Sequence, residues 1–145
     1  MKSRFVLAGL AVLALVVANS LRAADEKPAL KCPVSGQATK ADKTVAFNGG
    51  KVEFCCDKCP TAFNANSAKF AGKANLQLIQ SGQLKQIKCP LTGRPMAADK
   101  SVEIAGVKVA VCCGNCLAKA TKVSGDEQIT LLLSDTSKGY EAAKK

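Results

Sequence analysis

The sequence predicts an α+β protein of two tandem small units, each built from a cysteine turn, a β-hairpin and a following helix. At an offset of 57 positions, residues 31–59 align with residues 88–116 without a gap, and 14 of these 29 positions are identical. Such internal identity indicates a duplication. Within the copies, alternating apolar runs flank a turn, and a helical pattern of apolar residues follows.

The first 24 residues have the features of a secretory signal peptide. Lys2 and Arg4 precede an apolar run over residues 5–18, and the segment that follows ends in the small residues Ala23 and Ala24. This run is shorter than the about 18 apolar residues that suggest a membrane span. We therefore expect residues 1–24 to be removed, and the protein to be exported, in a periplasmic compartment, without membrane attachment.

The remaining chain divides into residues 25–87, the first unit with a connecting segment, and residues 88–145, the second unit with a C-terminal tail. Loss of the leader lowers the formal net charge from +10 to +7. The lysines are scattered without interleaved aromatic residues, and an exported chain rarely meets nucleic acid. A nucleic-acid partner is therefore not expected, and the basic surface is interpreted as solvated.

In the first unit, residues 44–47 and 51–54 alternate in polarity around Asn48-Gly49-Gly50, which predicts a β-hairpin. The second unit repeats this pattern around Ala105-Gly106. From Asp57 to Phe70 we expect one helix, because Phe63 and Phe70 lie seven residues apart and Pro60 suits a first turn.

The connecting segment, residues 71–88, is expected to be ordered as a short helix and then a strand leading into Cys89. In the tail, the apolar run from Ile129 to Leu133 aligns with the region around Leu76 and is expected to play the same part. The polar end, residues 137–145, is expected to fray.

The cysteines are the candidate functional residues. The chain has no histidine, so it lacks the usual general base and the Cys-His or Ser-His nucleophile. We therefore do not expect an enzyme. Each unit instead places one cysteine in a Cys-Pro turn and three at the junction of strand and helix, namely Cys32, Cys55, Cys56 and Cys59 in the first unit, and Cys89, Cys112, Cys113 and Cys116 in the second.

This arrangement favours a soft-metal site in each unit. Residues three and four apart share one side of a helix, so Cys59 can face Cys55 or Cys56, and the turn delivers Cys32 from across the hairpin. Four thiolates suit Zn(II), while Cu(I) accepts two or three soft ligands. Because Cys55 and Cys56 are adjacent, one of them is expected to be a spare or supporting residue. A protein partner in the export compartment is a further expectation.

Two alternatives remain open from the sequence. An even number of cysteines in a small exported domain is typical of a disulfide framework, which would make the protein a structural or interaction module. The pairs Cys56–Cys59 and Cys113–Cys116 have CxxC spacing at a helix start, which is typical of thiol oxidoreductases. The hairpin before them differs from the βαβ pattern of a thioredoxin-like domain.

The first unit resembles the YHS domain, a relative of the TRASH-type treble-clef modules. The resemblance rests on Cys-Pro-Val-Ser-Gly, the hairpin, and Glu-Phe-Cys-Cys-Asp-Lys-Cys-Pro-Thr-Ala-Phe, with matches at Phe54, Cys55, Cys59, Phe63 and Phe70. It covers residues 31–70 and 88–125. It implies a treble-clef-like fold and heavy-metal binding, with copper or zinc sequestration, delivery or resistance as the function.

The chain departs from that family at several positions. Cys32 stands where many YHS domains have aspartate, Ser35 where they have cysteine, and Cys56 where serine is common, which leaves the choice of ligands open. The second unit keeps every thiol but has no phenylalanine. We therefore expect it to depend more on metal, disulfides or packing against the first unit.

Overall fold

The structure, a computed structural model, describes residues 29–144. The predicted signal peptide, residues 1–24, lies outside these residues. The first unit contains β1 (Lys40–Phe47), β2 (Gly50–Phe54), α1 (Lys58–Ala65), α2 (Ser67–Gln80) and β3 (Leu84–Gln86). The second contains β4 (Ser101–Ile104), β5 (Val107–Ala110), α3 (Gly114–Thr121), α4 (Gly125–Leu133) and β6 (Tyr140–Ala142). The α+β class is confirmed.

Both predicted hairpins are present, and they share one register. β1 pairs antiparallel with β2, with Val45 opposite Val52, and β4 pairs with β5, with Val102 opposite Val109. Each turn uses two residues of positive φ, Asn48 and Gly49 in the first unit, and Ala105 and Gly106 in the second. Two consecutive positive φ values match the twist of the flanking strands in a two-residue hairpin turn. The two hairpin turns therefore have the same backbone conformation.

The single helix predicted from Asp57 to Phe70 is wrong, because two helices meet at Asn66. Asn66 has φ −151° and ψ 63°, and its side chain accepts the backbone N–H of Lys69 as the cap of α2. Asparagine competes for backbone hydrogen bonds in this way, which favours a helix start over a helix interior. Phe63 and Phe70 nevertheless lie near each other across the break, since their ring centroids are 6.4 Å apart.

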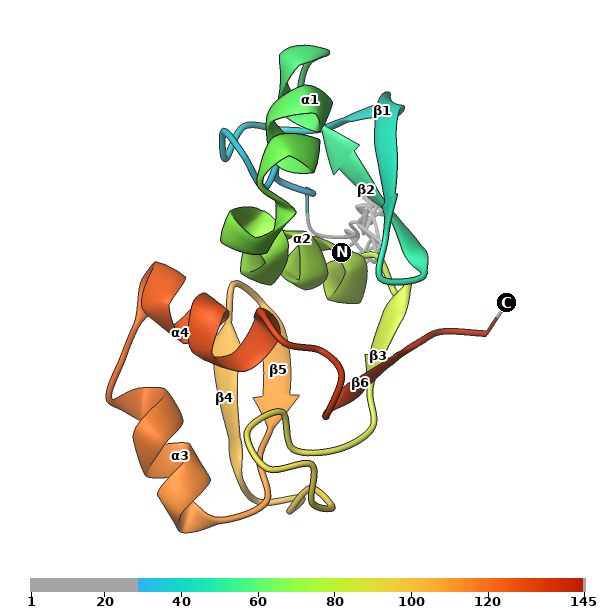
Figure 1. The fold of residues 1–145 in the computed structure, drawn as a ribbon. Helices are drawn as coiled ribbons and strands as arrows, with labels where there is room; N and C mark the ends of the chain where they lie inside the picture. Colours follow the sequence, from blue (N-terminus) through green and yellow to red (C-terminus); the bar gives the residue numbers. More distant parts are fainter. Residues whose placement is uncertain (1–28, 145) are drawn as a thin grey trace, which may run out of the picture.

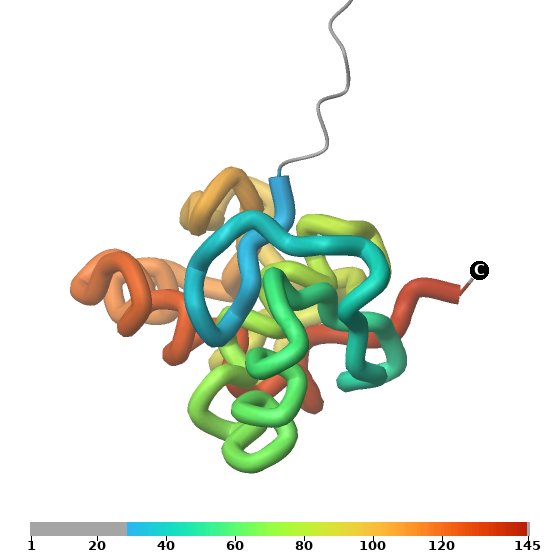
Figure 2. The backbone as a smooth tube through the Cα atoms, turned by 90° about the horizontal axis from the view of Figure 1, so that it is seen from above, coloured from blue at the N-terminus to red at the C-terminus, as the bar shows by residue number. Residues whose placement is uncertain are grey.

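The two units share one hydrophobic core. Helices α2 and α4, which are equivalent in the repeat, lie side by side between the two hairpins (Figure 1). Their backbones approach closely at Gly72, where an added Cβ would lie 3.2 Å from the carbonyl oxygen of Ile129. Figure 2 looks down on the first unit, with orange and red segments of the second unit behind and beside it. The core joins apolar residues of both units, among them Phe54, Phe63, Leu78, Ile104, Val109, Leu132 and Leu133.

The connecting segment is ordered, as predicted, and the expectation of a fraying tail is wrong. Strands β3 and β6 pair antiparallel, with Lys85 opposite Glu141 and Leu84 opposite Ala142. Tyr140 is 6% exposed, and the carbonyl of Gly139 accepts the N–H groups of Ile87 and Lys88. Polar composition suggested an end without structure, but the backbone hydrogen bonds to β3 hold it in place. Lys145 lies outside the described residues.

Candidate metal centres

The first element of each centre is the turn that carries its first cysteine. In the first unit, the N–H of Cys32 donates to the carbonyl of Gln37 at 2.8 Å, and the N–H of Gly36 donates to the carbonyl of Cys32 at 2.8 Å. The second unit repeats both bonds from Cys89 to Arg94 and from Gly93 to Cys89. Gly36 and Gly93 have φ values of 74° and 69°, a conformation that glycine adopts without a steric penalty. The two turns thus have one conformation.

A buried glutamine fastens the first turn to the hairpin. The amide of Gln77, which is 1% exposed on α2, donates to the carbonyls of Lys31 at 3.0 Å and Glu53 at 2.9 Å. Its oxygen accepts the N–H of Glu53 at 2.7 Å. Lys31 precedes Cys32, and Glu53 lies two residues before Cys55, so this side chain holds together the two backbone segments that carry these thiols.

The second unit has the same three bonds from a different glutamine. Gln86, on β3, donates to the carbonyls of Lys88 at 3.1 Å and Ala110 at 2.6 Å, and accepts the N–H of Ala110 at 2.9 Å. Lys88 and Ala110 are the repeat equivalents of Lys31 and Glu53. We call Gln77 and Gln86 the glutamine clamps. Sequence reasoning missed them, because they occupy unrelated positions in the repeat.

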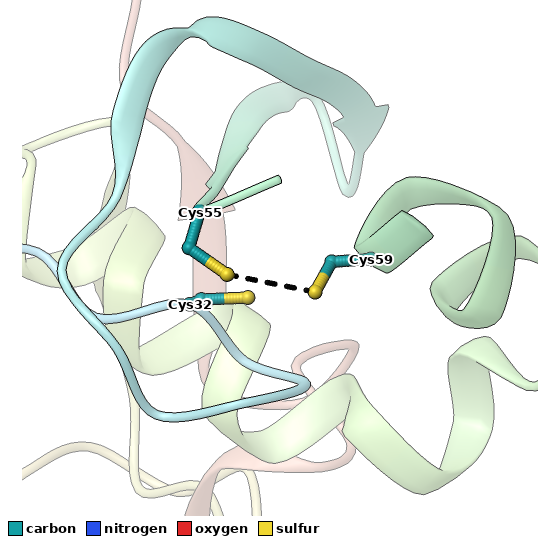
Figure 3. A group of neighbouring side chains, drawn as sticks. All are labelled: Cys32, Cys55 and Cys59. Atoms are coloured by element: carbon teal, nitrogen blue, oxygen red, sulfur yellow. Dashed lines mark hydrogen bonds between the residues drawn. The ribbon is translucent and has the colours of Figure 1, made fainter. Parts of the chain in front are cut away.

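Three sulfurs converge in the first unit. The thiols of Cys32 in the turn, Cys55 after β2 and Cys59 in the first turn of α1 point toward one another (Figure 3), all within 4.8 Å. The Sγ atoms of Cys55 and Cys59 are 3.6 Å apart. A tetrahedral Zn–thiolate site with bonds of about 2.3 Å places its sulfurs about 3.8 Å apart, so this spacing suits a bound metal.

The second unit reproduces this triad. Cys89, Cys112 and Cys116 also lie within 4.8 Å of one another, and the Sγ atoms of Cys112 and Cys116 are 3.6 Å apart. The turn cysteine and the helix cysteine of each triad are buried, while the cysteine at the hairpin end is half-buried. Each centre therefore has a closed inner side and one partly open side.

Cys56 and Cys113 lie outside these two triads. Cys56 is exposed, and its Sγ lies 3.3 Å from that of Cys59. Neither residue belongs to the groups whose sulfurs are all within 4.8 Å. Of the eight predicted ligands, the structure thus brings six together in two groups of three. In each adjacent cysteine pair, the first cysteine belongs to the triad and the second lies beside it.

Hydrogen bonds prepare the turn thiols for ligation. Burial alone would raise the pKa of Cys32, but hydrogen bonds from the Ser35 hydroxyl and from the backbone of Ser35 and Cys55 lower this pKa to about 6. For Cys89, burial acts in the same direction, and bonds from the Thr92 hydroxyl and the backbone of Cys112 lower its pKa to about 7. Each turn therefore offers a thiolate near neutral pH.

The pKa values of the helix thiols, Cys59 and Cys116, are raised rather than lowered. Burial, with added hydrogen bonds to neighbouring thiols, raises the pKa of Cys59 and raises that of Cys116 to about 12. Loss of these protons requires a compensating positive charge, which a bound metal ion would supply. All eight cysteines are free thiols in the structure. The donor set fits a soft metal ion in each unit.

Family models, curated proteins and solved structures give no match to this chain. Among residues 29–144, the helices are too short or too polar to cross a membrane. The functional conclusion therefore rests on the geometry of the two triads. Within each triad, the three sulfurs lie close enough together to bind one metal ion.

Proposed function

We propose that this chain is an exported protein of two YHS-like units that binds Cu(I) or Zn(II) at its two cysteine triads, for sequestration, delivery or resistance. The observation that carries the proposal is the convergence of three sulfurs within 4.8 Å in each unit. Thiolates select soft ions such as Cu(I) and Zn(II) over hard ones. A role in binding rather than catalysis is supported by the absence of histidine from the chain.

The family and the location also belong to this proposal. A YHS-like identity is supported by the quoted motifs, together with the cysteine turn, hairpin and helix in each unit. Export is supported by the apolar run and basic start of residues 1–24. A protein partner that receives or supplies the metal in the same compartment would complete a delivery function.

One experiment tests the proposal against its rivals. The full chain is expressed with its leader, purified from the export compartment without chelators, and analysed for metal, free thiols and intact mass. We expect bound copper or zinc, eight titratable thiols after metal removal, and a mass that lacks residues 1–24. A metal-free protein whose mass is lower by about two hydrogens per bridge would instead support a disulfide-stabilised module. One reducible thiol pair would support an oxidoreductase.

A further inference from the structure

A hydroxyl group occupies the same place beside both triads. The Ser35 Oγ lies 3.1 Å from the Sγ of Cys55, and the Thr92 Oγ1 lies 3.2 Å from the Sγ of Cys112. Each hydroxyl follows the turn cysteine by three residues, in Cys-Pro-Val-Ser-Gly and Cys-Pro-Leu-Thr-Gly. Serine and threonine differ in shape but share the hydroxyl, so the shared group is the feature that both centres retain.

Each hydroxyl also has a second contact, with the backbone of its own turn. The backbone N–H of Gln37 donates to the Ser35 oxygen at 3.3 Å, and the N–H of Arg94 donates to the Thr92 oxygen at 3.4 Å. Each hydroxyl oxygen thus accepts one bond from the backbone, and its single proton can be donated to a triad sulfur, either the hairpin-end thiol or the turn thiol whose pKa the same hydroxyl lowers. A hydrogen bond to a thiolate stabilises its negative charge.

We propose that these two hydroxyls limit each centre to three sulfurs and thereby make it a site for three-coordinate Cu(I) in preference to tetrahedral Zn(II). This inference rests on the proposed function and assigns its metal. A structural Zn(II) site closes with four ligands, whereas Cu(I) accepts three soft ones. Three thiolates around Cu(I) carry a net charge of −2, and a hydroxyl that donates to one sulfur stabilises this excess charge, while a fourth thiolate would increase it.

The neighbouring thiol does not supply the fourth corner in this arrangement. A four-sulfur tetrahedron needs every pair of sulfurs about 3.8 Å apart. Cys56 lies 3.3 Å from Cys59 but outside the set of sulfurs that are all within 4.8 Å of one another. Ser35 and Thr92, by contrast, approach a triad sulfur from the turn itself, which is where a Cys-x-x-Cys turn would present its second thiol.

The test compares Cu(I) and Zn(II), each added alone to the metal-free full chain, in the natural sequence and in two double variants. Ser35→Cys with Thr92→Cys adds a sulfur at each position, and Ser35→Ala with Thr92→Val removes each hydroxyl. X-ray absorption counts the sulfurs around each ion, and competition with chelators gives the affinities. Circular dichroism confirms that each variant is folded.

We expect three sulfurs around Cu(I) in the natural chain. The added cysteines should give four-sulfur Zn(II) and raise zinc affinity far more than copper affinity. Removal of the hydroxyls should lower Cu(I) affinity by about 10- to 100-fold, the range typical of groups that support metal ligands. Cys56→Ser with Cys113→Ser serves as a control and should leave the sulfur count at three.

Three results would overturn the inference. Four sulfurs around Zn(II) in the natural chain would show that the fourth corner is already filled. An unchanged preference between the two ions after the cysteine substitutions would show that the hydroxyl position does not decide the metal. If the natural chain binds neither ion, the proposed function fails as well, so this result is distinct from the other two.

Discussion

The two units of this chain hold their cysteine triads in the same geometry but with different supporting residues. Gln77 from α2 joins the cysteine turn of the first unit to its hairpin, while Gln86, from strand β3 in the connecting segment, makes the same three bonds to the turn and hairpin of the second unit. The thiols and turns are retained, and the clamp has moved to another element. The two units therefore share the backbone positions of their cysteines, whereas the glutamine that fixes those positions comes from a different element in each.

The cores differ as well. Around Phe63, the first unit has three aromatic contacts at 5.1, 5.4 and 6.4 Å between ring centroids. The second unit has Ile104, Val111, Ala120 and Glu127 at the equivalent positions of Phe47, Phe54, Phe63 and Phe70. Ile104 and Ala120 pack into the core shared with the first unit, whereas Val111 lies in a smaller cluster with Cys89 and Cys116, and Glu127 is exposed. Packing against the first unit is one of the three supports expected for the second unit, beside metal and disulfides.

The largest expected effect is the loss of one centre without the other. Cys59→Ser should remove metal from the first unit only, and Cys116→Ser from the second only, because each thiol belongs to a single triad. Metal analysis by mass spectrometry of the intact folded protein should show about two ions per chain falling to about one. Simultaneous loss of both ions in either single variant would mean that the centres are not separate.

A smaller effect is expected from the aromatic core. Phe63→Ala should lower the free energy of unfolding by about 3–5 kcal/mol, because this ring is 1% exposed and leaves a cavity. Since the core spans both units, unfolding followed by fluorescence of Tyr140, the single tyrosine, should shift with the circular dichroism signal. Met96→Ala, at an exposed residue, is the control. A tyrosine transition that stays in place would indicate independent units.

The glutamine clamps should contribute less to stability than Phe63, and each should affect the metal affinity of one centre only. Gln77→Leu and Gln86→Leu each leave three backbone groups without their partner, at a cost of about 1–3 kcal/mol. Gln77→Leu should weaken metal binding at the first centre and Gln86→Leu at the second, each by about 10- to 100-fold, measured by chelator competition.

A matched control for the clamps is Gln80→Leu, whose amide donates to Ala105 at the tip of the second hairpin. It should not change the affinity of either centre. If Gln77→Leu weakens both centres equally, its effect is on overall stability rather than on the position of the first turn.

The smallest effect concerns Tyr140, which stands at the repeat position of Gln83. Gln83 bonds both backbone groups of Lys51, whereas the buried hydroxyl of Tyr140 has no hydrogen-bond partner among the described residues. Tyr140→Phe should therefore keep or raise stability, by about 1 kcal/mol. Burial raises the pKa of Tyr140, so the unfolded chain ionises first as pH rises above about 10.

The raised pKa of Tyr140 makes the stability of the folded protein decrease at alkaline pH. The contribution of Tyr140 is fully present below the tyrosine pKa of the unfolded chain, and stability falls as pH rises from there toward the folded pKa. In Tyr140→Phe this alkaline loss should be smaller, as measured by urea denaturation at pH 9 to 11. An alkaline loss as large as that of the natural chain would assign it to other groups.

The sequence predicted the features that depend on neighbouring residues. The turns at Asn48-Gly49 and Ala105-Gly106 dictate their hairpins, and the spacing of Cys55 and Cys59 places two thiols on one side of a helix start. The break at Asn66 escaped prediction, because an apolar pattern of helical period runs across it. The clamps and β6 depend on contacts between segments distant in sequence, so Gln77, Gln86 and Tyr140 gave no local signal. Ser35 was visible only as a departure from cysteine.

The pairing of β3 with β6 has an evolutionary consequence. Lys85 lies opposite Glu141 and Leu84 opposite Ala142, and in the repeat Glu141 is the equivalent of Leu84 and Ala142 that of Lys85. The pairing is therefore self-complementary, as in an isologous dimer with two-fold symmetry. A shorter ancestor with one unit would expose this strand edge and could join a second copy of itself through the same register. Gene duplication would then have fused a homodimer into one polypeptide, after which each half was free to change the side chains that support its sulfurs.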